Sequence, residues 1–315
     1  MQYRKLGSSD LNCSVIGLGG WGFGDANWGE VAFENAVEIV RAALDAGVNF
    51  IDTAQTYGMG RSERVIAEGI KGYDREKLIL ADKCGVRKVE GVNYFDWRPE
   101  VTRSMLEQSL KDLQTDYIDL YQVHWPNDET PLKEAFEELN RIREEGLIRY
   151  VGVSNFSIEQ MEEARLYCPI VSLQPQYSLL HRQIEEDLLP YCIKKNIGVI
   201  SYGSIASGVL SGKYTARPQF SDKDPRQGFY QAYYSEENWP KISGLIATLG
   251  HVAEKYGCET VHIAIAWVLA QKGVTVAICG ARDAQQARVN AKAADIHLSQ
   301  EDLAYIQSGY VHFMG

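Results

Sequence analysis

Residues 49–57 read Asn-Phe-Ile-Asp-Thr-Ala-Gln-Thr-Tyr, an apolar run that ends at Asp52 and is followed five residues later by Tyr57. Two later apolar runs also end at ionisable residues, Lys83 and His124. If the three runs are parallel strands of one closed barrel, their carboxyl ends lie at the same mouth, where barrel enzymes carry their catalytic residues. The spacing therefore predicts a catalytic site made of these four side chains.

Short apolar runs alternate with amphipathic stretches along the whole chain. The runs lie at about 15–18, 48–52, 78–82, 117–123, 148–153, 171–175, 198–202 and 275–279. The stretches of helical period lie near 33–46, 62–71, 99–113, 131–145, 157–167, 184–196, 241–256 and 283–294. Eight strand–helix alternations without a linker-like segment predict an α/β fold, a (β/α)8 TIM barrel that takes residues 1–315 as one domain.

Some features fall outside this eightfold pattern. Residues 1–14 predict an N-terminal β-hairpin, and residues 259–272 predict an extra helix near the C-terminus, before the eighth strand. Ser62 and Glu63 are the residue types that open helices, so they predict the start of the second helix.

The longest segments without periodicity, 85–98 and 203–240, follow the third and seventh strands. Both are rich in aromatic residues. Long loops in compact domains are commonly functional. These two are therefore predicted as loops that line an apolar substrate pocket over the barrel mouth.

The composition limits the partners. The formal net charge is −10 and no block of Lys or Arg occurs, which argues against nucleic acid and anionic membranes as partners. The N-terminus has charges where a leader would be apolar, and no apolar run is long enough to span a bilayer. The six cysteines have neither disulfide-framework nor metal-ligand spacing. A soluble, cytoplasmic, reduced protein without a metal is expected.

The four ionisable residues suit one kind of chemistry. A tyrosine has a free pKa of about 10, and a neighbouring ammonium lowers it. Lys83 can supply that ammonium, and Asp52 keeps Lys83 charged; His124 can orient a substrate oxygen. The set suits carbonyl reduction or alcohol oxidation by a hydride carrier. Taken singly, each residue has a structural reading, because Tyr57 is one of 18 tyrosines and the other three suit surface, capping or packing positions.

A Gly-x-Gly-x-x-Gly match at Gly17, Gly19 and Gly22 is interpreted as a decoy. A dinucleotide-binding fingerprint opens a helix directly, whereas here a loop is predicted over residues 23–29 and helical period begins only near Ala32.

Further motifs occur in order along the chain. They are Gly-Leu-Gly-Gly-Trp at 17–21, Asp-Thr-Ala-x-x-Tyr-Gly at 52–58, Arg-Ser-Glu at 61–63, Lys83, Tyr-Ile-Asp-Leu at 117–120 running to His124, Gly-Val-Ser-Asn-Phe at 152–156, Gln174-x-x-Tyr177-Ser178, Gly-Val-Leu-Ser-Gly-Lys-Tyr at 208–214, and Gly280-Ala281-Arg282 with Asn290. Together they resemble the aldo-keto reductase family over nearly the whole length, and residues 57–63 resemble a bacterial branch that includes inositol-utilisation reductases. The resemblance implies a barrel that binds NADP(H) across its mouth, with the four residues as a catalytic tetrad and Tyr57 as proton donor.

The resemblance also implies cofactor contacts. Ser154, Asn155 and Gln174 match positions that bond the nicotinamide carboxamide, and Tyr202 matches the aromatic on which the ring stacks. The remaining matches are a pyrophosphate cradle at Gly203, Ser204, Ile205, Ala206, Ser207, Gly208 and Leu210, closed by Lys213 and Arg226; adenosine contacts at Gly280, Arg282, Gln286 and Asn290; and Gly20, Trp21 and Asp52. Arg282 at a helix N-terminus suits a 2′-phosphate and favours NADP(H). As alternatives, Ser154 and Asn155 form an N-cap, and Arg226 and Arg282 are surface charges.

Two departures from the family pattern bear on function. The loop after the seventh strand commonly reads Tyr-Ser-Pro-Leu-Gly, whereas residues 202–206 read Tyr-Gly-Ser-Ile-Ala. Asp82 stands where a small polar residue is common; strand alternation points it away from the barrel interior, while an inward Asp82 would compete for Lys83. Cys84, beside Lys83, is expected to pack, with a redox-sensitive thiol as the alternative.

We therefore expect an NADPH-dependent reductase of a small carbonyl or polyol, with Trp21, Tyr57, His124 and Trp125 lining the substrate pocket. One alternative is a Schiff-base lyase that uses Lys83 as nucleophile. Another is a catalytically weak NADPH-binding sensor. The sequence leaves the natural substrate, the direction of reaction, and the choice between monomer and homo-oligomer open.

Overall fold

The computed structural model describes residues 1–24, 31–89, 92–127, 130–221 and 224–310. The predicted loop is described only at residues 23 and 24, since residues 25–29 lie outside these ranges. Residues 21–24 instead form a single helical turn, α1.

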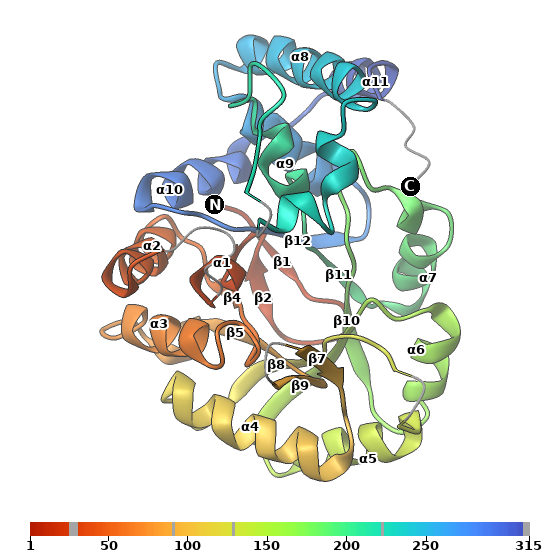
Figure 1. Cartoon of the computed structure of the whole chain (residues 1–315). Coiled ribbons are helices and arrows are strands. Elements are labelled where there is room, and N and C mark those ends of the chain that lie inside the picture. The colour runs from red at the N-terminus through yellow and green to blue at the C-terminus, as the bar shows by residue number, and fades with distance from the viewer. Residues whose placement is uncertain (25–30, 90–91, 128–129, 222–223, 311–315) are drawn as a thin grey trace.

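Eight parallel strands close into a barrel, as predicted (Figure 1). In chain order they are β3 (Ile16–Gly19), β4 (Phe50–Asp52), β5 (Ile79–Cys84), β8 (Ile118–Val123), β9 (Ile148–Ser154), β10 (Ile170–Gln174), β11 (Gly198–Ser201) and β12 (Val274–Cys279). Each strand pairs with the next along the chain, and β12 closes on β3. The connections are therefore the short crossovers that a (β/α)8 fold requires.

Helices surround the barrel on its outer side (Figure 1). They are α1 (Trp21–Gly24), α2 (Phe33–Asp45), α3 (Arg61–Gly69), α4 (Pro99–Leu113), α5 (Leu132–Glu144), α6 (Ile158–Ala164), α7 (Leu188–Lys195), α8 (Trp239–Tyr256), α9 (Thr260–Ala270), α10 (Ala284–Lys292) and α11 (Gln300–Ser308). Short 3-10 segments are η2 (Arg75–Lys77), η3 (Gln183–Glu185), η4 (Ala206–Ser211), η5 (Pro225–Gln227), η6 (Gln231–Tyr234) and η7 (Ala293–Asp295). The expected extra helix near the C-terminus is α9, and α11 is a further one.

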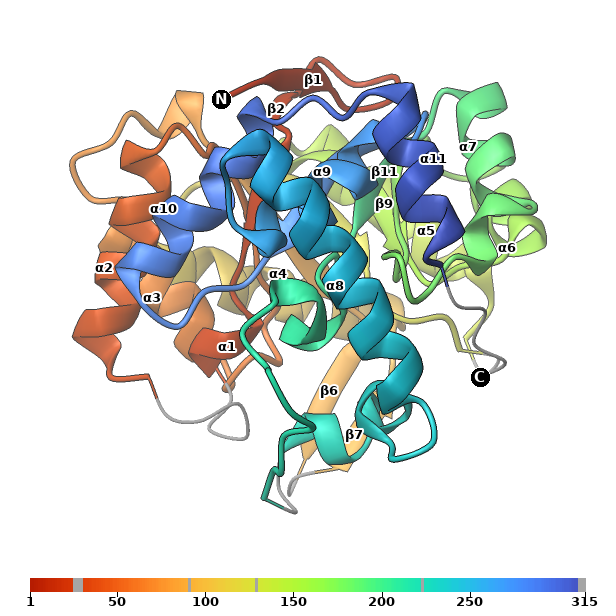
Figure 2. The ribbon, with the colours of Figure 1, turned by 90° about the horizontal axis from the view of Figure 1, so that it is seen from above.

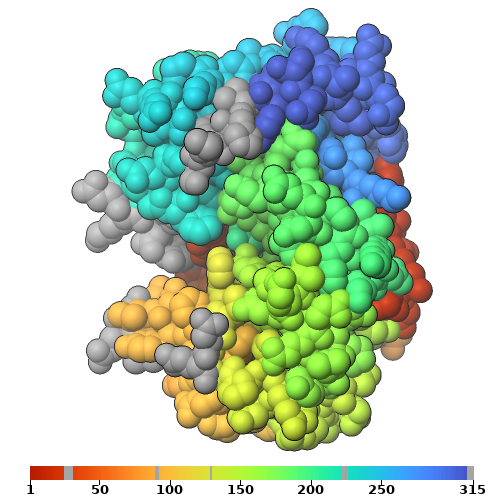
Figure 3. Space-filling view, turned by 90° about the vertical axis from the view of Figure 1, so that its right-hand side faces the viewer, coloured from red at the N-terminus to blue at the C-terminus, as the bar shows by residue number. Residues whose placement is uncertain are grey.

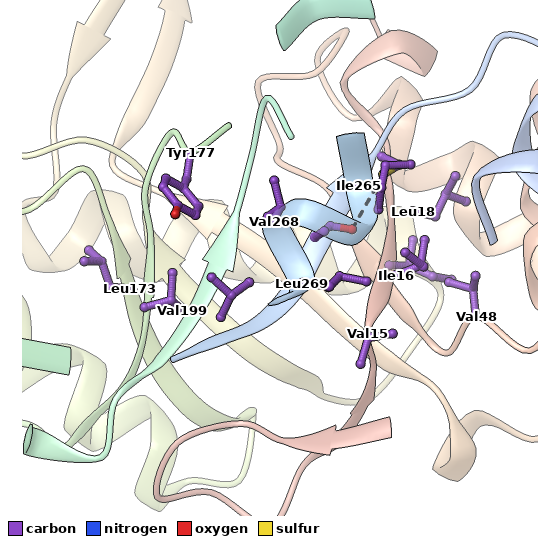
Figure 4. Packing of buried hydrophobic residues seen from close by; sticks show 14 of the residues in the cluster. Val15, Ile16, Leu18, Val48, Leu173, Tyr177, Val199, Ile265, Val268 and Leu269 are labelled. Atoms are coloured by element: carbon purple, nitrogen blue, oxygen red, sulfur yellow. Dashed lines mark hydrogen bonds between the residues drawn. The ribbon is translucent and has the colours of Figure 1, made fainter. Parts of the chain in front are cut away.

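Alternation along the strands separates two apolar layers. Phe50, Ile79 and Leu120 belong to a cluster inside the barrel, whereas Ile51 and Leu80 belong to the larger cluster between the strands and the helices. Figure 4 shows part of that outer layer, where side chains of β3 and β11 lie near those of α9. Because successive side chains point to opposite faces, the residue that ends each strand inherits its direction from the residues before it.

The N-terminal hairpin, β1 (Tyr3–Lys5) paired with β2 (Asn12–Ser14), closes the barrel at the end opposite the mouth (Figure 2). Leu6 and Leu11 are buried in the interior cluster. A Cβ at Gly7 would lie 2.4 Å from the Val171 carbonyl oxygen and 2.6 Å from the Gly198 nitrogen. The hairpin turn therefore presses directly on two strands and requires glycine there.

The loop predicted at 85–98 is partly wrong, because it contains a second antiparallel hairpin, β6 (Val86–Val89) with β7 (Val92–Phe95). The sequence of β6, Val-Arg-Lys-Val, lacks period-two alternation, and β7 is exposed along its whole length. This hairpin lies at the end of the molecule away from β1 and β2 (Figure 2). In the space-filling view the surface is notched between this region and the region of residues 210–240 (Figure 3).

The second barrel helix starts within one residue of the predicted position, but Ser62 does not cap it. Helix α3 begins at Arg61 behind Gly60, and its first turn has no side-chain cap. Ser62 and Glu63 are both fully buried. Ser62 donates to the Gly20 carbonyl at 2.9 Å instead of capping the helix.

All six cysteines are free thiols. Within the described ranges, the helices are too short or too polar to cross a lipid bilayer.

Candidate active site

The four predicted catalytic side chains converge at one end of the barrel. Asp52 ends β4, Lys83 is the next-to-last residue of β5, and His124 directly follows β8. Tyr57 lies in the turn between β4 and α3, and its ring is 5.8 Å from that of His124, edge to face. Alternation explains the convergence, since Asp52 and Lys83 follow the inward residues Phe50 and Ala81 by two positions.

Lys83 is the centre of this group. Its Nζ donates to Asp52 Oδ2 at 2.7 Å, to the Thr53 carbonyl oxygen at 2.8 Å and to Tyr57 Oη at 3.3 Å. Burial by itself would lower the pKa of Lys83, but Asp52 and Tyr57 outweigh burial and raise it. The amine is therefore a fully hydrogen-bonded ammonium ion that points at the phenol.

The expectation that the pKa of Tyr57 is lowered is wrong for this arrangement. Burial is the largest influence and raises the pKa of the phenol; Lys83 opposes it, and Asp52 adds to it. The carboxylate that keeps Lys83 charged also cancels part of its effect on the phenol. Tyr57 is consequently a phenol that keeps its proton at neutral pH and has an ammonium ion beside its oxygen.

His124 is neutral. Burial, followed by the charge of Lys83, lowers its pKa well below the ordinary value. A neutral imidazole has one N–H donor and one acceptor, so it can hydrogen-bond a substrate oxygen without adding a second positive charge. Trp125 follows it and is half-buried, and Trp21 is stacked at 6.4 Å from the Tyr57 ring. Of the residues predicted to line the pocket, Trp21 and His124 therefore have their rings beside Tyr57.

Two buried amide side chains, Gln174 and then Gln122, form a row that starts at Asp52. Gln174 Nε2 donates to Asp52 Oδ1 at 2.8 Å and lies 3.4 Å from Gln122 Oε1. Gln174 thus holds Asp52 Oδ1, while Asp52 Oδ2 accepts a hydrogen bond from the Lys83 ammonium. Sequence reasoning missed Gln122 and the Thr53 carbonyl. Gln122 lies on β8, two residues after Leu120, which faces the barrel interior. Because alternate side chains of a strand point the same way, this spacing was the sequence signal that could have identified Gln122.

Ser154 and Asn155 form a polar chain with Tyr202. Tyr202 Oη donates to Asn155 Oδ1 at 3.0 Å, and Asn155 Nδ2 donates to Ser154 Oγ at 3.0 Å and to the His124 carbonyl oxygen at 3.2 Å. Asn155 has a φ of 62°, so its backbone is left-handed. The N-cap alternative is wrong, because the residue that caps α6 is Ser157. The chain therefore fixes amide groups beside His124.

The segment after β11 has the backbone of an anion cradle. Gly203, Ala206, Ser207 and Gly208 all have positive φ, a backbone conformation that occurs in anion-binding loops. Ser207 Oγ is buried and has no hydrogen-bond partner among the described residues. Lys213 Nζ lies 3.6 Å from the position of a Cβ at Gly208. A left-handed backbone, an unused hydroxyl and a cation therefore lie together, which fits a pyrophosphate.

The other cradle residues have structural partners. Ile205 and Gly203 accept the N–H groups of Gly208 and Ala206, at 3.0 and 2.7 Å. Ser204 Oγ lies 3.0 Å from Ser201 Oγ. Leu210 is fully buried. Without the proline of the common pattern, backbone and serine bonds hold the loop.

Arg226 is held by its own neighbours. Its guanidinium donates to both carboxylate oxygens of Asp224 and to Tyr214 Oη, and it lies 4.0 Å over the Phe220 ring. Burial lowers the pKa of Arg226, but the Asp224 carboxylate outweighs burial and raises it. The surface-charge alternative is therefore wrong for Arg226, which is a half-buried part of the loop.

The residues matched to adenosine contacts lie together after β12. Asn290 Nδ2 donates to the Gly280 carbonyl oxygen at 3.0 Å, and Gln286 Oε1 accepts the Arg282 N–H at 3.1 Å. Asp283 caps α10 by accepting the Gln286 N–H at 2.7 Å. Arg282 is exposed just before the cap, so its side chain is available at a helix N-terminus.

Two glycines of the Gly-x-Gly-x-x-Gly match pack inside the barrel, since a Cβ at Gly17 would lie 2.9 Å from the Phe50 ring and one at Gly19 would lie 2.8 Å from the Ile278 side chain, whereas a Cβ at Gly22 would meet open space. Two neighbouring glycines outside the match are also in close contact. A Cβ at Gly20 would lie 2.5 Å from Ser62 Oγ and 3.0 Å from the Asp52 carbonyl oxygen. A Cβ at Gly24 would lie 2.1 Å from the Tyr57 backbone. These glycines let α1 pack against the turn that holds Tyr57, and the interpretation of the match as a decoy agrees with the closed barrel.

A family model described as the aldo/keto reductase family matches residues 15–310. The chain belongs to the aldo-keto reductase family. It is an oxidoreductase that acts on carbonyls or alcohols. It is 36% identical to aldo-keto reductase YhdN of Bacillus subtilis, over 96% of this chain and 91% of that protein. It is 32% identical to the NADH-specific methylglyoxal reductase of Escherichia coli, over 96% of both.

Solved structures of aldo-keto reductases agree with the fold. The glycerol dehydrogenase AKR11B4 from Gluconobacter oxydans has a TM-score of 0.89 at 34% identity, over 98% of this chain and 94% of that one. Aldo-keto reductase AKR11C1 from Bacillus halodurans has a TM-score of 0.83 at 28% identity, over 99% and 97%. Two of these relatives are named for glycerol and methylglyoxal, which are small oxygenated carbon compounds.

Proposed function

We propose that this protein reduces a small aldehyde or ketone, or oxidises the matching alcohol, with NADP(H) as cofactor. The single observation that carries the proposal is the Lys83 ammonium held between Asp52 and the Tyr57 hydroxyl at the barrel mouth. When bound, the nicotinamide would supply or take up a hydride. The side chains at the mouth then have to manage the oxygen and its proton.

Tyr57 is the proton donor in the reducing direction. Its oxygen lies at the mouth, and the phenol is protonated at neutral pH because burial raises its pKa. As the proton leaves, negative charge develops on the phenol oxygen 3.3 Å from the Lys83 ammonium. That attraction exists mainly in the transition state, so it lowers the barrier more than it strengthens binding.

His124 would orient the substrate. Its neutral imidazole lies next to the Tyr57 ring, and its single N–H can bond the carbonyl oxygen that receives the proton. Trp21 and Trp125 would exclude water from that oxygen. A small substrate suits this arrangement because aromatic rings surround Tyr57.

For the cofactor, we infer NADP(H) from Arg282. A guanidinium at a helix N-terminus suits a 2′-phosphate. The relative named as an NADH-specific methylglyoxal reductase makes this preference a direct question for this chain. Arg282→Ala is expected to weaken NADPH binding by about tenfold while leaving NADH binding within about twofold. Equal affinities of the wild type for both cofactors would contradict the preference.

A Schiff-base lyase is disfavoured by the state of Lys83. A protonated amine has no lone pair with which to attack a carbonyl, and this one donates to three oxygens. Trapping of substrate on Lys83 by borohydride would overturn this argument.

The test of the proposed function is Tyr57→Phe. The variant is expected to lose about 10²- to 10⁴-fold in turnover, with NADPH affinity nearly unchanged. Tyr191→Phe is the matched control, since Tyr191 lies on α7 and donates to Glu162 at the surface. Loss of turnover and of NADPH affinity in equal measure would contradict the assigned role. Tight NADPH binding by the wild type without turnover of any carbonyl would indicate the sensor instead.

A further inference from the structure

A second group of acids lies behind Lys83, on the outer side of the barrel. Asp82 on β5 and Glu63 on α3 are both fully buried, with 0% of their surface exposed. Alternation sends Lys83 inward and Asp82 outward, as predicted from the sequence. The mechanism described above uses neither carboxyl.

The two carboxyls lack a side-chain cation. Among the described residues, neither forms an ion pair, and the buried atoms Glu63 Oε1, Glu63 Oε2 and Asp82 Oδ2 have no hydrogen-bond partner. Two adjacent buried carboxylates without counter-ions are strongly unfavourable. One proton between them removes the conflict, because a carboxylic acid can donate to a carboxylate.

The environments of the two groups decide which one keeps the proton. Burial, reinforced by the charge of Asp82, raises the pKa of Glu63 to about 9. Burial raises the pKa of Asp82 only to about 6, because the Lys83 N–H, the Glu63 side chain and the Lys83 charge counteract it. At neutral pH, therefore, Glu63 holds the proton and Asp82 holds the negative charge.

Asp82 is connected to the active site in two ways. Its Oδ1 accepts the backbone N–H of Lys83 at 2.7 Å. Its charge also acts on Tyr57, where it helps to raise the pKa of the phenol. The same carboxylate thus holds the end of the strand that carries the ammonium ion and adds to the field at the proton donor.

We propose that Glu63 and Asp82 share one proton and act as positioning residues for Lys83. Ionised Asp82 anchors the Lys83 backbone and stabilises the protonated forms of Lys83 and Tyr57. Protonated Glu63 donates to Asp82 and keeps it oriented toward Lys83. The effect on turnover rests on the proposed function of Tyr57, whereas the shared proton does not.

Other groups around the pair do not supply the same titration. Asp112 of α4 acts on Glu63 from a distance and is paired with Arg64 at 3.1 Å. Ser109 of α4 faces both carboxyls but does not ionise. Burial raises the pKa values of the neighbouring Cys84 thiol and Tyr121 phenol, so both are neutral. From inside the barrel, Lys83 is held charged by Asp52.

The experiment compares the pH dependence of carbonyl reduction in Asp82→Asn, Glu63→Gln and the double variant. Asp82→Asn removes the charge, so kcat falls about tenfold and the alkaline limb moves down by about one pH unit, with NADPH affinity unchanged. Glu63→Gln lowers kcat by about two- to threefold and also moves the alkaline limb to lower pH. The reason is that the glutamine cannot ionise at alkaline pH and so adds no second negative charge beside Asp82. Glu138→Gln is the control, a buried carboxylate of α5 paired with Arg103 and Arg141.

If the variants fold and the alkaline limbs of their pH–rate profiles coincide with that of the wild type, the proposal is overturned. If the variants do not fold, a measurement on the wild type alone still tests whether the two carboxyls share a proton. Infrared spectra should show a buried protonated carboxyl at neutral pH that disappears as the pH rises through about 9. Absence of that band would overturn the shared proton. If the wild type reduces no carbonyl, the proposed function fails while the infrared result still decides the state of the pair.

Discussion

Replacing Asp52 by asparagine removes the counter-charge of a buried ammonium ion. Lys83 and Asp52 are only 1% and 4% exposed, and their 2.7 Å contact is the sole ion pair of Lys83 among the described residues. Breaking one side of a buried pair costs about 3–5 kcal/mol, because the remaining charge is left without compensation. Asparagine keeps the shape and can still accept from Gln174, so the loss measures charge more than packing.

The expected shift in melting temperature follows from chain length. Unfolding entropy of about 2.1 cal/mol/K per residue gives about 0.7 kcal/mol/K for 315 residues. A loss of 3–5 kcal/mol therefore lowers Tm by about 5–8 °C, measured by calorimetry at neutral pH. Turnover should fall as well, since Lys83 without Asp52 loses its proton more easily.

A double variant separates charge from packing. Adding Lys83→Met to Asp52→Asn removes the stranded ammonium and fills a similar volume with an apolar side chain, so Tm should recover by several degrees while activity stays lost. If the double variant melts at or below the temperature of Asp52→Asn, the uncompensated charge is not the cause, and the reasoning is refuted.

Three further predictions concern pH and packing. Turnover in the reducing direction should be flat between about pH 7 and 9, because the raised pKa of Tyr57 keeps the phenol protonated and the lowered pKa of His124 keeps the imidazole neutral; a midpoint near pH 7.5 would contradict this. As the pH rises, the Glu63 carboxyl ionises in the unfolded chain at its ordinary pKa of 4.5 but in the folded protein only at about 9, so its contribution to stability falls between these two values. The Tm of Glu63→Gln minus that of the wild type should therefore increase with pH over this range, and a constant difference would contradict the raised pKa. Gly20→Ala places a Cβ 2.5 Å from Ser62 Oγ and should cost about 1–3 kcal/mol by denaturant unfolding, whereas an unchanged midpoint would show that α3 moves freely.

The barrel and the convergence of Asp52, Tyr57, Lys83 and His124 were predictable because they depend on local patterns. The runs that end at Asp52 and Lys83 are continuously apolar, as strands buried on both faces are, and successive side chains of a strand point to opposite faces, so Asp52 and Lys83 share the direction of Phe50 and Ala81. The same rule placed Asp82 outward. Parallel connection then brings the strand ends together whatever the details of the loops.

The rest depends on contacts between distant parts of the chain. The pKa of Tyr57 reflects how completely the barrel buries it, and a sequence pattern does not report that. Glu63 was predicted only as a helix-opening residue, because its burial beside Asp82 arises only when the segments that carry the two residues come together in the fold. The hairpin β6–β7 was missed because each of its strands is only four residues long and β7 is exposed along its whole length.

The most direct test of the central claim is a single turnover of the enzyme with NADPH already bound, followed by the absorbance of the reduced nicotinamide after mixing with a small aldehyde. The wild type should oxidise the bound cofactor rapidly, while Tyr57→Phe should bind it equally well and oxidise it at least about a hundredfold more slowly. Equal rates in the two proteins would show that the phenol beside Lys83 does not deliver the proton.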